Sequence, residues 1–293
     1  MTIAGALKAQ LVQRLPWRLQ SRNNLMMATA NWYFEGVLAT PPMPVARNAT
    51  VEIHSLICHR DVNMMLTSAK SFLRFVPDAS LVLHDDGSIT GTDVALFERH
   101  LPGARVVSRA EADAAMRQAL PPDVFAQRAK YFFLLKLFDF NHFHAGGKTI
   151  LLDSDIVFLS KPLEIIHWMS TPDIEPFYNL DWCPSYRAER MPDGIEIPPR
   201  LNAGFMGYDG RFTMEQIWEC CRSVNYWLED QTIYALLLAR SRAQALDAQR
   251  YRVYTGGDVE PETPMVHFIS PNRFKTLLYP RLARRVHRQL RQN

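Results

Sequence analysis

The sequence is poor in cysteine and has no long apolar run. Its four cysteines are Cys58, Cys183, Cys220 and Cys221, without a Cys-x-x-Cys pair, which excludes a disulfide scaffold and indicates reduced thiols. No apolar stretch reaches the roughly 18 residues that a membrane-spanning helix requires. The first residues also lack the compact apolar segment and cleavage site of a signal peptide. We therefore expect a cytoplasmic protein.

Repeats, low-complexity tracts and glycine-rich phosphate loops are missing as well. No Gly-x-Gly-x-x-Gly follows the first predicted strand, so the sequence lacks the fingerprint of dinucleotide-binding proteins. Nothing between residues 49 and 280 has the composition of a linker. We expect one domain over 49–280, preceded by an appendage over 1–48 and followed by a basic helix over 281–293.

Charge is distributed unevenly along the chain. Residues 1–48 carry a net charge of +4 and residues 281–293 carry +5, which leaves −6 for residues 49–280 of a chain whose total is +3. A nucleic-acid-binding domain normally carries its basic surface on the folded module. We therefore expect no nucleic-acid partner.

Each basic end allows two interpretations. Arg14, Arg18 and Arg22 recur every fourth residue, which predicts either a helix that contacts a membrane surface or partner, or an N-terminal helix packed on the domain. The C-terminal stretch carries five arginines beside an apolar stripe that includes Val286 and Leu290. It predicts either a peripheral contact with the anionic inner membrane surface or a solvated terminal helix.

Short apolar segments alternate with amphipathic ones along the middle of the chain. The predicted strands are 51–58, 81–84, 104–107, 148–152, 178–182, 201–208 and 264–269, and the predicted helices are 63–75, 126–140, 163–169, 213–221 and 227–239. This alternation predicts an α/β fold with a mostly parallel central sheet flanked by helices.

Two aspartates after a buried strand are the most informative feature. Asp153 and Asp155 follow the apolar run 148–152, and ligands of open α/β sheets bind at such strand ends. Paired carboxylates repel each other unless a cation joins them, and oxygen ligands select Mg²⁺ or Mn²⁺. The pair predicts a metal site that holds a phosphorylated ligand. The alternative is a solvated turn. Asp85 and Asp86 form a second such pair, for which a turn before a helix is the favoured interpretation.

Further polar residues follow predicted strands or lie on predicted helices. Lys136 precedes the aspartate pair on a helix that returns to the sheet, where it either approaches the metal or lies on the surface. The segment Asn202-Ala203-Gly204 permits close approach of a ligand to the backbone, or forms a plain strand bulge. Residues 191–199 predict a lid loop. His267, followed by Arg273 and Lys275, suits a metal and a phosphate, although a lone histidine is usually structural.

Together these residues resemble one family. Leu151-Leu152-Asp153-Ser154-Asp155-Ile156, Asn202-Ala203-Gly204-Phe205, Asp230-Gln231 and His267 follow the order of the motifs in retaining glycosyltransferases of the glycogenin and bacterial lipopolysaccharide galactosyl- and glucosyltransferase type. The resemblance covers about residues 50–280 and implies a GT-A fold.

The resemblance also implies an activity and roles for individual residues. It implies transfer of a sugar, with retention, from a nucleotide-diphosphate sugar, commonly a uridine diphosphate sugar, to a glycan, lipid-linked or polysaccharide acceptor. The implied metal is Mn²⁺ or Mg²⁺. The residues and their implied roles are: Asp153, Asp155 and His267 for the metal; Cys58, His59 and Ser154 for the nucleotide; Lys136, Asp181, Asn202, Ala203, Gly204, Arg273 and Lys275 for the donor; and Asp230 and Gln231 near the reacting carbon.

Two departures from the family pattern are visible. The first strand ends in Cys58-His59-Arg60 where the family usually has an acidic or small polar residue that meets the base. The loop after His267 lacks the family's glycine, and its lysine is shifted to Lys275. These departures affect the contacts expected for the uracil base and for the phosphates.

Two other functions are compatible with part of the pattern. Asp153-Ser154-Asp155-Ile156-Val157 also fits the nucleophile motif of haloacid-dehalogenase-type phosphatases, with Glu229-Asp230 as later metal ligands. Such a strand usually opens its domain, whereas about 100 residues of α/β pattern precede this one. A non-catalytic protein that binds nucleotide sugars is the other alternative.

Overall fold

The computed structural model describes residues 16, 21–184, 194–223, 230–270 and 272–292. The strands are β1 (Val51–Ile57), β2 (Ser80–Asp85), β3 (Arg105–Val107), β4 (Lys148–Leu152), β5 (Ile156–Phe158), β6 (Phe177–Leu180), β7 (Leu201–Asp209), β8 (Gln244–Ala245), β9 (Tyr251–Val253) and β10 (Met265–His267). The helices are α2 (Arg22–Ala28), α3 (Ala30–Phe34), η2 (Glu35–Ala39), η3 (His59–Asp61), α4 (Val62–Leu73), α5 (Gly91–His100), α6 (Arg109–Ala119), α7 (Pro122–Lys130), α8 (Phe133–Phe143), α9 (Leu163–Ser170), α10 (Met214–Ser223), α11 (Asp230–Leu237) and α12 (Leu278–Leu290).

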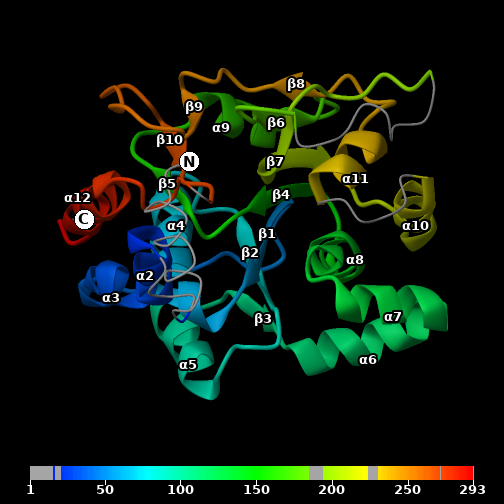
Figure 1. Cartoon of the computed structure of the whole chain (residues 1–293), viewed down its shortest axis with the longest axis horizontal. Coiled ribbons are helices and arrows are strands. Elements are labelled where there is room, and N and C mark those ends of the chain that lie inside the picture. The colour runs from blue at the N-terminus through cyan, green and yellow to red at the C-terminus, as the bar shows by residue number, and fades with distance from the viewer. Residues whose placement is uncertain (1–15, 17–20, 185–193, 224–229, 271, 293) are drawn as a thin grey trace, which may run out of the picture.

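A mixed central sheet organises the molecule. Its strand order is β3-β2-β1-β4-β7-β6-β8, and a smaller sheet has the order β5-β10-β9. Figure 1 shows α4 on one side of β1, β2 and β4, and α8 on the other. This arrangement confirms the predicted α/β fold with a helix-flanked, mostly parallel sheet.

The parallel half of the sheet explains the unbroken apolar run of β4. β1 pairs in parallel with both β2 and β4, with Ile53 beside Leu81 and Ile150. Every residue of β4 is buried, because helices cover both faces of a parallel sheet. The carboxyl ends of β1, β2 and β4 therefore meet at one edge.

Two antiparallel pairings bring distant segments to that edge. β7 runs against β4, so that the Asp153 N–H donates to the Gly204 carbonyl at 2.8 Å. β10 runs against β5, with His267 opposite Ile156. The Phe268 N–H donates to the Asp155 carbonyl at 2.9 Å. Backbone pairing alone thus places both segments beside the two aspartates.

The turn that precedes β4 depends on glycine. Gly146 and Gly147 have φ of +125° and +83°, values that other residues rarely adopt. A Cβ on Gly147 would lie 2.2 Å from the Thr50 carbonyl oxygen. The predicted turn signal therefore marks both a backbone conformation and a close approach to the start of β1.

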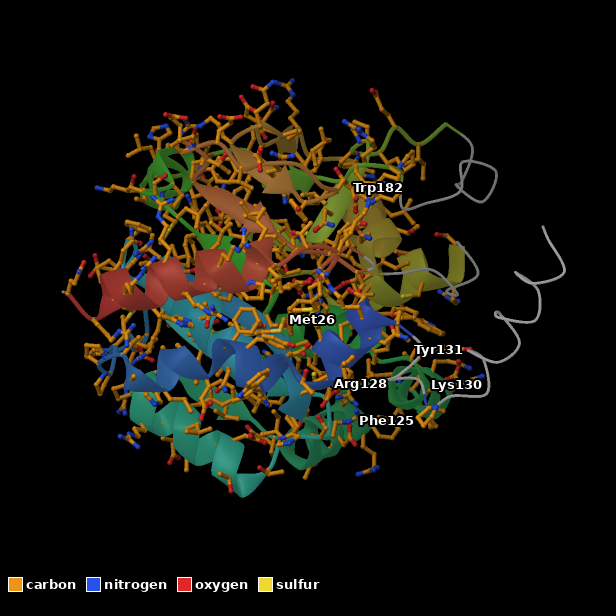
Figure 2. The ribbon with its side chains drawn as sticks, turned by 60° about the vertical axis from the view of Figure 1, so that its left-hand side comes forward. Met26, Phe125, Arg128, Lys130, Tyr131 and Trp182 are labelled. Atoms are coloured by element: carbon orange, nitrogen blue, oxygen red, sulfur yellow. The ribbon has the colours of Figure 1, made fainter. Side chains whose placement is uncertain are left out.

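One predicted helix is wrong. Residues 126–140 form parts of two helices, α7 and α8, because Tyr131 adopts an extended conformation between them. Buried Arg128 on α7 donates to both carboxylate oxygens of Asp139 on α8, each at 2.6 Å. This bidentate pair joins the two helices across the break. Figure 2 labels Arg128, Lys130 and Tyr131 at the junction.

The two basic ends pack beside each other where they are described. α3 contacts α4, and Asn31 on α3 accepts a hydrogen bond from the Asn63 N–H at 2.9 Å. α12 contacts α3 and α4 through an apolar side that includes Val286 and Leu290. Arg14 and Arg18 lie outside the described residues, as does part of the predicted lid, 191–199. Among the described helices, none is long and apolar enough to cross a membrane.

Candidate functional site

A polar cleft of about 500 Å³ opens at the carboxyl edge of the central sheet. It is lined by residues from the ends of β1 and β4, the starts of α8, β7 and α11, and the segment after β10. These residues are Leu56, Ile57, Cys58, Arg60, Asp61, Asp86, Phe132, Phe133, Lys136, Asp153, Ser154, Asp155, Asn202, Gly204, Asp230, Gln231, His267, Ile269, Ser270 and Arg273.

Two carboxylates and an imidazole converge in this cleft. Asp153, Asp155 and His267 each offer a ligand atom within 4.8 Å of the others. His267 Nε2 lies 3.0 Å from Asp155 Oδ1 and 3.9 Å from Asp153 Oδ2. Asp155 and His267 are buried, whereas the Asp153 side chain is 32% exposed. One face of the cluster is therefore open to a ligand.

Lys136 connects the aspartate pair to the start of α11. It lies on α8 with its Nζ 3.0 Å from Asp153 Oδ1 and 2.9 Å from Asp230 Oδ2. Burial lowers the pKa of Lys136, but the two carboxylates raise it above its ordinary value, so the ammonium stays charged. Lys136 therefore does not lie on the surface. It holds two acidic segments together.

Arg273 performs a similar function on the other side of the cluster. Its guanidinium donates to Asp155 Oδ2 and lies 3.7 Å from Asp61 Oδ2. Burial raises the pKa of Asp155, but Arg273 and His267 more than offset this and hold the pKa well below its usual range. Asp155 is consequently ionised at any physiological pH.

The charge and shape of the cluster suit a divalent cation. Five carboxylates and three cationic side chains line the cleft, which gives a net charge of −2 with His267 neutral. His267 Nδ1 is buried and makes no hydrogen bond among the described residues. Asp153 Oδ2 faces His267 Nε2 at 3.9 Å. Two carboxylates and an imidazole are ligands that Mn²⁺ accepts.

The Asn202-Ala203-Gly204 segment forms the floor beside Asp153. Asn202 donates to Asp181 Oδ2 and accepts from the Gly204 N–H, both at 2.9 Å. A Cβ on Gly204 would lie 2.2 Å from His267 Cε1 and 2.7 Å from Asp153 Oδ2. Glycine is therefore required here so that β7 can approach the cluster. Ala203 contributes its carbonyl, 3.4 Å from Lys136 Nζ.

Some of the other predicted site residues line the cleft, and others do not. Cys58 and Ser154 line it, and burial with Asp61 raises the pKa of Cys58 to about 12. His59 instead pairs with Asp93 at 2.7 Å. Asp181 and Lys275 do not line the cleft, and Lys275 is exposed.

The sequence analysis gave several lining residues no role in the site. Arg60 and Asp61 follow β1, Asp86 follows β2 and was assigned to a turn, and Phe132 and Phe133 lie at the start of α8. The first three could have been found from the rule that parallel strands end at one edge. The aromatic pair reaches the cleft only because the helix breaks at Tyr131, which the sequence did not reveal.

The pair Asp85–Asp86 forms a turn, as favoured. Asp85 Oδ1 accepts from the Gly87 N–H at 2.7 Å, and Asp86 Oδ1 accepts from the Ser88 N–H at 2.9 Å. Asp85 Oδ2 also accepts from the Arg109 N–H at 3.2 Å, at the start of α6. These carboxylates satisfy backbone donors.

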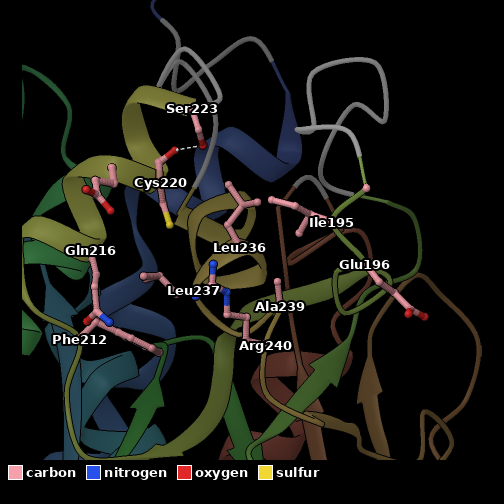
Figure 3. A pocket seen from close by; sticks show the side chains of 12 residues that line it. Ile195, Glu196, Phe212, Gln216, Cys220, Ser223, Leu236, Leu237, Ala239 and Arg240 are labelled. Atoms are coloured by element: carbon pink, nitrogen blue, oxygen red, sulfur yellow. Dashed lines mark hydrogen bonds between the residues drawn. The ribbon is translucent and has the colours of Figure 1, made fainter.

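A second cleft, of about 660 Å³, lies between α10, α11 and the segment 194–196. Figure 3 shows its mostly apolar lining, which includes Ile195, Phe212 and Leu236, and the hydrogen bond from Ser223 to the Cys220 carbonyl. Its described lining holds Glu196, Glu219 and Arg240 but no cluster of converging ligands. The polar cleft is therefore the candidate active site, although it is smaller.

Comparisons with known proteins reveal the fold but no close relative. No protein-family model matches the chain, and no curated protein matches its sequence. An active-site mutant of LgtC has a TM-score of 0.56 and 12% identity, covering 81% of this chain and 95% of that one. The galactosyltransferase LgtC in complex with donor and acceptor sugar analogs has a TM-score of 0.54 and 13% identity, covering 80% and 95%.

A eukaryotic enzyme shows the same similarity. Mouse xyloside xylosyltransferase 1 has a TM-score of 0.51 and 15% identity, covering 79% of this chain and 99% of that one. All three similar structures are glycosyltransferases of the GT-A fold, and the matches span most of the chain. The chain therefore has the GT-A glycosyltransferase fold that the sequence motifs predicted.

Proposed function

We propose that the protein is a metal-dependent glycosyltransferase. It transfers a sugar from a nucleotide-diphosphate sugar, a uridine diphosphate sugar in the first instance, to a hydroxyl of a glycan, lipid-linked or polysaccharide acceptor. The observation that carries the proposal is the convergence of Asp153, Asp155 and His267 at the edge of a glycosyltransferase fold. Structural similarity to LgtC bound to donor and acceptor sugar analogs supports it.

The metal would be held by Asp153, Asp155 and His267. A bound divalent ion, Mn²⁺ or Mg²⁺, supplies positive charge against the diphosphate that leaves. Arg273 lies next to Asp155 in the same cleft and is the protein cation best placed to bind a phosphate oxygen. Lys275 is exposed and outside the cleft lining, so we assign it a weaker, peripheral role.

The donor sugar would lie over the start of β7 and α11. Lys136 fixes Asp230 beside Asp153, and Gln231 lines the cleft next to it. Asn202 is oriented by Asp181, which makes Asp181 a positioning residue in this proposal. Preorganised polar groups of this kind stabilise charge that develops in the transition state. Asp230 and Gln231 are the groups we place nearest the reacting carbon, on the side that retention requires.

The nucleotide would extend toward the end of β1. Cys58, Arg60 and Ser154 line this part of the cleft, with Phe132 and Phe133 across it. Phe132 is 71% exposed, which is unusual for a large apolar ring. Aromatic rings stack on nucleobases. We therefore propose that these two phenylalanines contact the nucleobase together with Cys58. His59 would act only indirectly, through its pair with Asp93.

Calorimetry with nucleoside diphosphates tests the proposal. Uridine, guanosine, adenosine and cytidine diphosphates, with and without Mn²⁺, are titrated into the full chain. We expect one of them to bind only with Mn²⁺, and the Asp153→Ala/Asp155→Ala double variant to lose that binding. The Asp78→Ala/Asp123→Ala variant is the control, because both carboxylates are exposed and lie outside the cleft lining.

Other results would identify the alternatives. Release of phosphate from simple esters without nucleotide binding would favour a phosphatase, although Asn202 and His267 would then have no role in a site they help to build. Tight binding of a nucleotide sugar without transfer or hydrolysis would favour a non-catalytic binding protein. Full transfer activity in Asp155→Ala would contradict the proposed metal site.

A separate proposal concerns the basic C-terminal helix. α12 buries Tyr279, Val286 and Leu290, so that its exposed side is left with arginines. Trp32, which is 70% exposed, shares a surface hollow with Arg284. We propose that this surface contacts anionic membranes peripherally, since each arginine near such a surface contributes about 1 kcal/mol.

Charge reversal is a better test of this contact than truncation. Deleting 281–293 would remove buried Val286 and Leu290 and expose the core beneath them. Arg284→Glu/Arg288→Glu keeps the apolar side intact and should abolish flotation with vesicles of anionic lipid at low salt. Arg117→Glu/Arg222→Glu, on α6 and α10, is the matched control. Equal flotation of all proteins would refute the contact.

A further inference from the structure

A second cluster of histidines and a carboxylate lies inside the protein, away from the cleft. Glu52 and His54 lie on β1, and His144 lies directly after α8. Each offers a ligand atom within 4.8 Å of the others, and all three are buried. None of them lines the candidate active site. The cluster sits between the central sheet and the end of α8.

Hydrogen bonding in this cluster leaves two acceptor atoms in contact with each other. His144 Nε2 donates to the Gly147 carbonyl at 3.1 Å, because a carbonyl can only accept. In a neutral ring, His144 Nδ1 is then an acceptor, and it lies 2.9 Å from Glu52 Oε2, which is also an acceptor. Two acceptors at this distance repel each other. Either an additional proton or a metal ion must lie between them.

The contacts of His54 match those of a metal-bound histidine whose second ring nitrogen hydrogen-bonds to another residue. His54 Nε2 lies 3.4 Å from Glu52 Oε2, and His54 Nδ1 lies 3.0 Å from His84 Nε2. Metal-bound histidines usually hydrogen-bond through their other ring nitrogen. Glu52 also accepts from the Ala145 N–H at 2.8 Å, which fixes its carboxylate. His84 would thus orient His54 without binding the ion itself.

Two of the ligand-atom spacings are close to those around a small ion. Metal–ligand bonds of about 2.0–2.1 Å in a tetrahedral site place neighbouring ligand atoms about 3.4 Å apart. The two distances to Glu52 Oε2 are 2.9 and 3.4 Å, so a shift of a few tenths of an ångström suffices at His144. The Thr149 hydroxyl, 3.3 Å from His144 Nδ1, offers a further oxygen.

We propose that Glu52, His54 and His144 form a buried structural site for a transition-metal ion, and that the preferred ion is Zn²⁺. Two imidazoles and one carboxylate suit Zn²⁺, whereas the oxygen-rich cluster of Asp153 and Asp155 suits Mn²⁺ or Mg²⁺. The ion would join β1 to the end of α8. Since α8 also carries Lys136, this site would fix the helix that supports the cleft.

Metal content tests the proposal directly. Tag-free full-length protein, purified without chelator, is dialysed against EDTA and analysed by plasma mass spectrometry. We expect about one zinc per chain to resist dialysis and to be released on unfolding, since structural zinc ions bind tightly. His144→Gln should lose the zinc. His142→Gln, two residues away on α8 and partly exposed, should keep it, as should Asp153→Asn.

A second measurement avoids the risk that a variant fails to fold. X-ray absorption at the zinc edge of the wild-type protein should show nitrogen and oxygen neighbours at about 2.0–2.1 Å with imidazole scattering. Added Zn²⁺ should raise the thermal unfolding midpoint of metal-stripped protein by roughly 5 °C or more. If the folded protein contains no zinc and added Zn²⁺ leaves its thermal unfolding midpoint unchanged, the proposal is wrong. A proton then lies between His144 Nδ1 and Glu52 Oε2.

Discussion

The molecule contains two groups of histidine and carboxylate that differ in their surroundings. The cleft cluster of Asp153, Asp155 and His267 lies at the edge of the sheet, with one carboxylate partly exposed. The core cluster of Glu52, His54 and His144 lies between the sheet and α8, with all members buried. Similar residue types thus occur both in an open cleft and inside the core.

The partners of the two clusters explain what each can do. Lys136 pairs with Asp153 and Arg273 pairs with Asp155, and Asp153 keeps an exposed side. In the core cluster, Glu52 lies against His144 and His54 and accepts a hydrogen bond from the Ala145 N–H. The first cluster is open to a ligand from the solvent, whereas the second is enclosed by the protein.

The largest effect that separates the clusters is expected at Asp153. Asp153→Asn removes one charge from the cleft but leaves a side chain of the same shape at a partly exposed position. We expect sugar transfer to fall by about 10³-fold, as for the loss of a principal electrostatic group. The thermal midpoint should change little. Steady-state kinetics with the donor identified by calorimetry, together with thermal unfolding, measures both. An active variant would show that the cleft cluster is not the metal site.

The converse effect is expected at Glu52. Glu52→Gln leaves His144 facing a neutral amide in the core, and breaking a buried charged pair typically costs about 3–5 kcal/mol. We expect the free energy of unfolding to fall by about 3 kcal/mol, while Mn²⁺-dependent nucleotide affinity of the folded fraction is retained. Denaturant unfolding and calorimetry report the two quantities. Loss of nucleotide affinity without loss of stability would reverse the roles assigned to the clusters.

Part of the dependence of folding stability on pH is expected from His287, which belongs to neither cluster. Burial, with Arg291 and Lys70, lowers the pKa of His287 on α12 from 6.5 to about 4. Between these values the unfolded chain binds a proton that the folded chain does not, so stability falls as the pH falls, by about 1.4 kcal/mol per unit. His287→Gln should remove about 3 kcal/mol of this dependence between pH 6.5 and 4. An unchanged slope would assign the acid sensitivity to other groups.

The smallest effect is expected from crowding the cleft cluster. A Cβ on Gly204 would collide with His267 and Asp153. Disturbing the residues that support a metal ligand typically lowers metal affinity by roughly 10–100-fold. We expect Gly204→Ala to weaken Mn²⁺ binding by about that factor. Gly207→Ala, also on β7, is the matched control, because it crowds the Phe177 ring of the neighbouring strand β6 instead. Equal weakening by both would indicate a general distortion of β7.

The sequence was informative where local pattern and topology agree. The apolar run of β4 indicated a strand covered on both faces, and the alternation of strands with helices indicated a parallel sheet. The aspartates after β4 were found because they break such a run. The general rule that ligands bind at strand ends then placed them in the cleft.

The remaining features depend on contacts between distant segments. The break between α7 and α8 accompanies the pairing of Arg128 with Asp139, which no helical pattern reveals. The core cluster was missed because β1 supplies two of its members and the end of α8 the third, and each histidine alone resembles an ordinary buried residue. Asp61 was missed because its partner, Arg273, is more than 200 residues away.

The antiparallel pairing of β5 with β10 has a consequence for synthesis of the chain. It brings His267 and Arg273 to Asp155, although 112 and 118 residues separate them. At about 5–20 residues per second, a ribosome would take roughly 6–24 s to make the intervening chain. During that interval the nascent protein presents its aspartates without the imidazole and guanidinium that neutralise them. Complete chains alone can assemble the cleft, so fragments released early would compete for neither metal nor nucleotide.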